Sequence, residues 1–172
     1  EQIPISQADA KDKRYIGNGA PKHFLSWSNN LTWRNFDLSV FFRGTFGFDV
    51  FNMRKYGMGL QGCGTDNVLR SAYLEDKNIR TGGGVISSYF LEDGSFIKLE
   101  NVTLGYNFTP KNRKLLDNMR IYLSAKNLFT LTGYSGNDPS IIDVNGIQPG
   151  VDSNSAYPTA TQLSLGVTLR FK

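Results

Sequence analysis

Few residues of this chain have the type and spacing that catalysis or metal binding requires. The only cysteine, Cys63, stands between two glycines, and the only histidine, His23, has no histidine or cysteine at ligand spacing. A lone cysteine cannot form an internal disulfide, and no nucleophile, base and orienting group recur at an interpretable spacing. We therefore expect neither enzymatic activity nor a bound cofactor or metal.

Oxygen ligands of the kind that calcium prefers are concentrated in residues 137–152. They include Asn137, Asp138, Asp143, Asn145 and Asp152, but their spacing is not that of a complete calcium loop. The same residue types, together with Gly and Pro, build turns. Turn formation is therefore the favoured interpretation, with calcium binding as the alternative.

Several tyrosines lie in polar stretches rich in Gly, Asn, Asp and Ser. They are Tyr56, Tyr73, Tyr89, Tyr134 and Tyr157. A tyrosine in a surface loop can stack on a sugar ring or contact a partner protein, although it more often packs loop against loop. Together with Asp138, these tyrosines are the candidate contacts for a ligand or partner.

Composition and charge exclude several classes of protein. The 172 residues carry a formal net charge of +4 that is spread along the chain, which gives weak support for nucleic-acid binding. No uninterrupted apolar run approaches the roughly 18 residues of a membrane-spanning helix. The chain begins at Glu1 without the segments of a secretory signal, so we expect a processed or truncated chain.

Alternation of apolar and polar side chains is the strongest pattern in the sequence, and it predicts strands whose two faces meet different surroundings. It occurs in residues 25–34, 36–48, 96–108, 119–130 and 162–171. Asn29 and Phe41 are the exceptions in the first two segments. In the third, Ile97 and Leu99 have the opposite phase to the residues after Glu100, which indicates either a bulge there or an upper half that rises above a membrane.

The lengths and connections of these strands favour a membrane barrel over a soluble β-sandwich. Soluble strands commonly have about 5–6 residues, whereas outer-membrane strands need roughly 9–11. Short connections, at residues 34–35 and 109–118, alternate with long ones, at 49–95 and 132–160, as in bacterial outer-membrane barrels. Four aromatics then fall at the inner edge of the membrane, as a girdle would: Trp33, Phe36, Phe108 and Phe171.

The predicted fold is therefore an all-β, antiparallel transmembrane barrel, of which this chain supplies about five strands. Because single-chain bacterial barrels start at about eight strands, the remaining strands must come from an upstream part of the chain or from further copies. A soluble carbohydrate-binding sandwich is the alternative. On the polar face, the cations Arg43, Arg120, Lys126 and Arg170 would line the lumen, where hydration or pairing is favoured and direct substrate contact is the alternative.

Six stretches resemble, in order and spacing, the C-terminal barrel of SusC-like, TonB-dependent outer-membrane transporters. They are residues 16–22 (IGNGAPK), 36–42 (FDLSVFF), 90–99 (FLEDGSFIKL), 101–106 (NVTLGY), 127–130 (NLFT) and 133–139 (GYSGNDP). The chain departs from the family at Lys98, where arginine is frequent, and at Lys172, which follows the terminal aromatic.

The resemblance implies that residues 1–172 are the C-terminal segment of a twenty-two-stranded barrel in the outer membrane of a Gram-negative bacterium, whose plug domain and other strands are absent from this chain. It implies active import of an oligosaccharide or peptide, energised through TonB and assisted by a SusD-like surface lipoprotein that acts as a lid. Lumen cations would then pair with plug carboxylates. A passive porin or receptor is the alternative function.

The last predicted strand carries a further expectation about assembly. Its apolar row is unbroken and consists of Leu163, Leu165, Val167, Leu169 and Phe171. Such a row resembles the signal by which outer-membrane barrels are recognised for insertion. We expect Leu165, Val167, Leu169 and Phe171 to serve as that signal.

Overall fold

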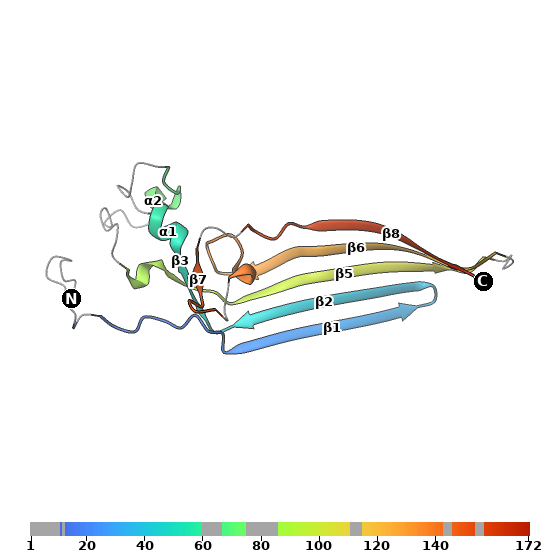
Figure 1. Ribbon diagram of the computed structural model, residues 1–172, viewed down its shortest axis with the longest axis horizontal. Coiled ribbons are helices and arrows are strands. Elements are labelled where there is room, and N and C mark those ends of the chain that lie inside the picture. Colours follow the sequence, from blue (N-terminus) through green and yellow to red (C-terminus); the bar gives the residue numbers. More distant parts are fainter. Residues whose placement is uncertain are drawn as a thin grey trace.

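The computed structural model describes residues 11, 13–59, 67–74, 86–110, 115–142, 146–153 and 157–172. Five long strands form one antiparallel sheet in chain order (Figure 1). They are β1 (His23–Trp33), β2 (Phe36–Phe46), β5 (Phe96–Phe108), β6 (Leu116–Thr132) and β8 (Gln162–Phe171). The predicted antiparallel pairing of consecutive segments is confirmed, although β6 extends further at both ends than the sequence indicated.

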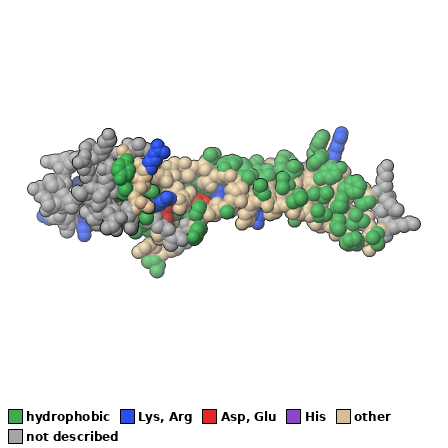
Figure 2. Space-filling model, turned by 90° about the horizontal axis from the view of Figure 1, so that it is seen from above, with side chains coloured by type: hydrophobic (Ala, Val, Ile, Leu, Met, Phe, Trp, Pro, Cys, Tyr) green, Lys and Arg blue, Asp and Glu red, His purple; other side chains and the backbone are tan. Residues whose placement is uncertain are grey.

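One face of this sheet is apolar and bare. The strand register places Trp27 opposite Phe42, Phe42 opposite Leu99, and Leu123 opposite Leu165. Trp27 is 52% exposed, Leu123 51% and Leu165 75%, and Figure 2 shows hydrophobic side chains gathered along the long strands. The sandwich alternative requires a second sheet over these side chains, and none of the described residues forms one.

A bulge interrupts the sheet halfway along β5. Phe41 pairs with Asn101 and Phe42 with Leu99, so Glu100 is an extra residue in β5. This confirms the bulge as the cause of the phase reversal. The extra residue returns Leu99 and Ile97 to the apolar side, because adjacent residues of a regular strand point to opposite faces.

A second irregularity, in β6, was not foreseen. Lys126 pairs with Asn101, but the next partner of β5, Leu99, pairs with Phe129. Asn127 lies between them with a φ of 53°, a left-handed conformation that asparagine adopts more readily than most residues. Its side-chain Nδ2 donates to the carbonyl of Ala160, 3.2 Å away, and β8 ends its pairing with β6 at this level.

The connections alternate as predicted. The β1–β2 turn and the β5–β6 connection lie at one end of the sheet, and the two long connections lie at the other (Figure 1). The four girdle aromatics lie at the end with the short connections: Trp33 pairs with Phe36, Phe108 pairs with Met119, and Phe171 pairs with Leu116. This register confirms their common position, and all four are exposed.

The long connections carry short elements of their own. These are β3 (Asp49–Asn52), α1 (Met53–Met58), α2 (Ser71–Leu74), η3 (Ser88–Phe90), β4 (Leu91–Asp93), η4 (Pro139–Ile141) and β7 (Val151–Asp152). β3 lies between β4 and β7 in a second sheet, at one end of the long strands (Figure 1). No helix among the described residues is long and apolar enough to cross a bilayer.

We call this second sheet, with α1 and the buried side chains beside it, the loop platform. Its core consists of Phe48, Val50, Phe96, Tyr134 and Ile142. These residues come from both long connections and from the start of β5, so the platform joins the two long connections to the wall of the large sheet.

Candidate functional site: the loop platform and the inner wall

The first family-like motif, residues 16–22, packs closely against the platform, and we call it the clip. The backbone N–H of Asn18 donates to Asp49 Oδ2 at 2.9 Å, and the N–H of Asp49 donates to the carbonyl of Asn18 at 2.8 Å. A Cβ on Gly19 would lie 2.5 Å from the carbonyl carbon of Pro149 and 2.9 Å from the nitrogen of Gly150. The motif therefore needs glycine because two backbone segments meet there.

The motif of residues 90–99 includes β4 and the tight turn into β5. Asp93 Oδ1 accepts a hydrogen bond from the N–H of Ser95 at 2.9 Å, a local bond typical of aspartate in turns. A Cβ on Gly94 would lie 2.5 Å from Val50 Cγ2 and 2.7 Å from Phe48 Cζ. Gly94 thus lets the chain turn directly over the core of the platform.

Glu92 in the same motif joins three segments. Its carboxylate accepts from the N–H and the hydroxyl of Ser135, each at 2.8 Å, and from Asn52 Nδ2 at 3.3 Å. Lys55 Nζ lies 3.7 Å from the same carboxylate. The Glu92 carboxylate thus connects β3, α1 and the start of the β6–β8 connection.

The motif of residues 133–139 supplies a buried tyrosine. Tyr134 is 6% exposed, and its hydroxyl donates to Asp152 Oδ2 at 2.6 Å. Burial raises the pKa of Tyr134 far above its ordinary value, and the bond to the Asp152 carboxylate acts in the same direction. Tyr134 therefore stays protonated and acts as a permanent donor.

The same motif also contributes a buried ion pair with the wall. Lys98 Nζ lies 3.0 Å from Asp138 Oδ2, and both side chains are almost fully buried. Burial by itself would raise the pKa of Asp138, but hydrogen bonds from Thr159, Ser140 and Lys98 outweigh it and lower that pKa to about 2. Asp138 is consequently a carboxylate at any physiological pH.

Aromatic side chains pack together on the outer part of the platform. Tyr56 meets Phe90 edge to face at a centroid distance of 5.2 Å and Phe51 at 5.8 Å. Lys55 Nζ lies 4.4 Å from the ring centroid of Tyr89, which itself packs on Phe90. The two remaining candidate tyrosines, Tyr73 and Tyr157, are exposed, Tyr157 to 92%.

The six candidate contacts therefore occupy different surroundings. Tyr56 and Tyr89 pack loop against loop, Tyr134 and Asp138 are buried and hydrogen-bonded, and Tyr73 and Tyr157 are free to meet another molecule. Contact with a ligand or a lid stays a prediction for all of them. Sequence reasoning missed Glu92, whose partners Asn52 and Ser135 lie far away along the chain, and it considered Asp152 only as a turn residue or calcium ligand.

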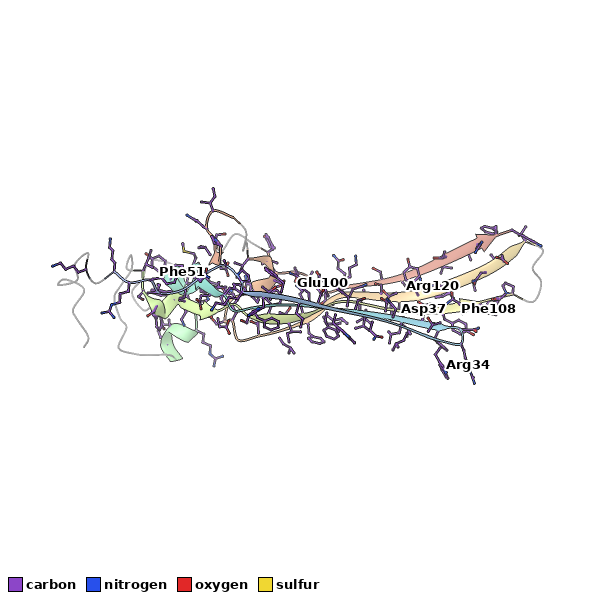
Figure 3. All side chains as sticks on the ribbon, turned by 90° about the horizontal axis from the view of Figure 1, so that it is seen from below. Arg34, Asp37, Phe51, Glu100, Phe108 and Arg120 are labelled. Carbon is purple, nitrogen blue, oxygen red and sulfur yellow. The ribbon has the colours of Figure 1, made fainter. Side chains whose placement is uncertain are left out.

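The inner wall, which is the polar face of the large sheet, pairs most of its charges within itself. Arg120 Nε donates to Asp37 Oδ1 at 3.0 Å, and Asn107 Nδ2 donates to the same oxygen at 2.8 Å (Figure 3). Arg43 Nε donates to Glu100 at 3.1 Å. Glu100 lies on the strand next to that of Arg43, whereas the Arg120–Asp37 pair reaches from β6 to β2 across the intervening β5. Neither arginine therefore needs a partner from outside the sheet.

The other two lumen cations differ. Arg170 lies 3.7 Å from Asp117, and its side chain is largely exposed. The Lys126 side chain is exposed and makes no hydrogen bond or ion pair within the part of the chain that the structure describes. Pairing with carboxylates outside this chain stays a prediction for Lys126.

The candidate metal ligands have protein partners where the structure describes them. Asn137 Oδ1 accepts from Arg54 at 2.7 Å, and Asp138 and Asp152 are bonded as above. No group of three or more His, Cys, Asp or Glu side chains that could hold a metal forms among the described residues. Cys63, Asp143 and Asn145 lie outside them, and His23 begins β1 at the loop end.

The sequence is similar to segments of known receptor proteins. No protein-family model matches the sequence. The chain is 26% identical to TonB-dependent receptor P3 of Formosa agariphila, over 93% of this chain and 17% of the receptor. It is 27% identical to TonB-dependent receptor SusC of Bacteroides thetaiotaomicron, over 95% of this chain and 16% of the receptor. The chain is thus similar to a segment of a SusC-like TonB-dependent receptor. This SusC-like segment spans about a sixth of the length of those relatives.

Solved structures agree on the fold of the SusC-like segment. The RagAB peptide importer in its closed-closed state matches 97% of this chain with a TM-score of 0.76 at 24% identity, using 19% of its own chain. Its open-open state matches the same share of this chain with a TM-score of 0.69 at 22% identity. The sheet and its loop platform therefore have the architecture of a portion of such a transporter barrel.

In the SusC-like segment, the residues expected to direct assembly share one surface. Leu165, Val167, Leu169 and Phe171 all point to the apolar face of β8 and are exposed. They meet the geometric requirement for recognition by another molecule, and the role itself stays a prediction.

Proposed function

We propose that this chain forms part of the wall and mouth of an outer-membrane barrel that actively imports a large nutrient, an oligosaccharide or a peptide, with energy supplied through TonB. The observation that carries the proposal is the bare apolar face of a sheet whose strands are long enough to cross a bilayer. Burying apolar surface in lipid is favourable by roughly 25 cal/mol for each Å² that is removed from water. Lipid is the natural cover for it.

The two edges of the sheet support a larger barrel. β1 and β8 each have a single neighbouring strand in the sheet. Unpaired backbone groups within a bilayer cost several kcal/mol each, so membrane sheets close on themselves. We assign residues 1–172 to the C-terminal segment of that barrel, with a plug domain and the other strands outside this range.

The proposed partners follow from the relatives. SusC and the RagAB importer are among the proteins that this chain is similar to, and both support a SusD-like surface lipoprotein over the mouth and the TonB complex on the periplasmic side. We place the protein in the outer membrane of a Gram-negative bacterium. Tyr73 and Tyr157 are the proposed contacts for ligand or lid, while Tyr56, Tyr89, Tyr134 and Asp138 act by holding the loops.

Energy dependence separates active import from a passive porin or receptor. Uptake of labelled nutrient would be measured in cells that carry the complete protein, with and without TonB, while outer-membrane fractions report the amount of folded barrel. Active import predicts that uptake disappears without TonB although the barrel remains. Unchanged uptake without TonB would assign the protein to the passive class.

A further inference from the structure

Lys98 occupies an unusual position on the inner wall. It lies on the polar face of β5, opposite Arg43 on one side and Thr130 on the other. Its side chain is only 3% exposed. A lysine ammonium has three donors, and an unsatisfied one would be costly at this depth.

All three donors are satisfied by the β6–β8 connection. Lys98 Nζ donates to Asp138 Oδ2 at 3.0 Å, to Ser140 Oγ at 2.8 Å and to Thr159 Oγ1 at 2.7 Å. The Thr159 hydroxyl in turn donates to Asp138 at 2.5 Å. Asp138 and Ser140 lie on the outgoing arm, which leaves β6, and Thr159 lies on the returning arm, which leads into β8.

We call the described part of this connection, residues 133–142, 146–153 and 157–161, the strap. Because Lys98 points to the same face as the Arg43–Glu100 pair, the strap lies against the inner wall and not against the apolar face. Its β7 strand pairs with β3, and Tyr134 and Ile142 enter the core of the platform. The strap therefore spans from the wall to the platform at the loop end.

The attachments of the strap are unequal in kind. The platform holds the strap through apolar packing, a short ladder and the hydrogen bonds of Ser135 and Asn137. On the wall, Asn127 bonds the returning arm at Ala160 and Thr161, whereas the Lys98 ammonium bonds both arms at once. Removing that ammonium leaves Asp138 as a buried carboxylate without its cation, which favours hydration and movement of the arms away from the wall.

We propose that Lys98 is a positioning residue that fastens both arms of the strap to the inner wall and so sets the free width of the barrel mouth on this side. The proposal rests on the proposed function, because it takes the polar face of the sheet as the lumen of a transporter. It adds to that function a specific residue that limits access to the lumen.

Thiol labelling tests the proposal without depending on uptake. Thr130→Cys places a thiol next to Lys98 on the inner wall, in the complete transporter with its other cysteines replaced by serine. A maleimide that carries a long polyethylene glycol chain is added to intact cells, and the labelled fraction is followed with time. The variants are Lys98→Met, Lys98→Arg, Thr159→Val and, as the matched control, Lys126→Met on the neighbouring strand.

The expected result is labelling about tenfold faster or more in Lys98→Met, since loss of a buried ionic partner strongly favours local opening. Lys98→Arg should restore slow labelling, because arginine keeps the charge and the donors. Thr159→Val should fall between the two, since it frees only the returning arm, and Lys126→Met should label at the parental rate.

Three results would overturn the role of Lys98. These are equal labelling in Lys98→Met and its parent, faster labelling in Lys126→Met to the same degree, or failure of Lys98→Arg to restore slow labelling. If Lys98→Met lowers the amount of barrel, the comparison of Thr159→Val with Lys126→Met decides the question. Loss of TonB-dependent import bears on the proposed function alone, since labelling requires no transport.

Discussion

Replacement of Gly19 by alanine should loosen the clip from the platform. The added Cβ would approach the backbone of Pro149 and Gly150, whose atoms cannot rotate away as a flexible side chain would. The clip must then move out, which strains the two hydrogen bonds between Asn18 and Asp49. Overpacking costs about 1–3 kcal/mol, and each lost hydrogen bond about 1 kcal/mol.

The local free energy of opening should therefore fall by about 3 kcal/mol, which is roughly a hundredfold in the opening equilibrium. Hydrogen exchange of the complete protein in detergent, read by mass spectrometry on peptides that cover residues 13–22 and 147–152, measures this quantity. Gly133→Ala is the matched control, because a Cβ there would have no neighbour within 4 Å. Equal protection in the two variants would refute the steric explanation of the motif.

Further predictions concern the motif of residues 133–139 and the last strand. Tyr134→Phe removes the bond to Asp152 and should lower the local stability of the platform by roughly 1–2 kcal/mol, seen as faster exchange of residues 133–142, whereas Tyr157→Phe, at an exposed site, should change nothing. Because the folded pKa of Asp138 is about 2, below its ordinary 3.8, its stabilisation of about 2 kcal/mol is complete above about pH 4 and is lost as the pH falls toward 2. Exchange of the strap should accelerate in that window, and an Asp138→Asn variant that showed the same acid sensitivity would contradict this assignment. Deletion of Phe171 and Lys172 should leave the protein in the periplasm, while deletion of Lys172 alone or Ser164→Ala should be harmless. Normal amounts of heat-modifiable barrel in the outer membrane after the double deletion would exclude the assembly role.

Much of the large sheet could be predicted because its pattern is local. Each long strand separates an apolar from a polar medium, so its own alternation records which side chains face which medium. The phase reversal at Glu100 was visible for the same reason, although the sequence left open whether a bulge or a strand half above the membrane caused it. The irregularity at Asn127 left no such trace. While β2 advances by two residues, from Val40 to Phe42, β5 advances by three and β6 by four, so β6 has two extra residues relative to β2. An even number of extra residues preserves the phase and is invisible in the pattern.

The sequence alone determined the strands, the alternation of short and long connections, the bare apolar face and the family-like motifs, since all of these are properties of neighbouring residues. Only the tertiary structure decided what the motifs do. Asp37 and Arg120 are 83 residues apart, and Lys98 and Thr159 are 61 apart, so no spacing rule connects them. Their pairing depends on the order of the strands in the sheet, on how far each bulge shifts the register, and on where the loops fold back onto the wall. The same holds for Gly19, whose requirement for glycine arises from a backbone segment about 130 residues further along the chain.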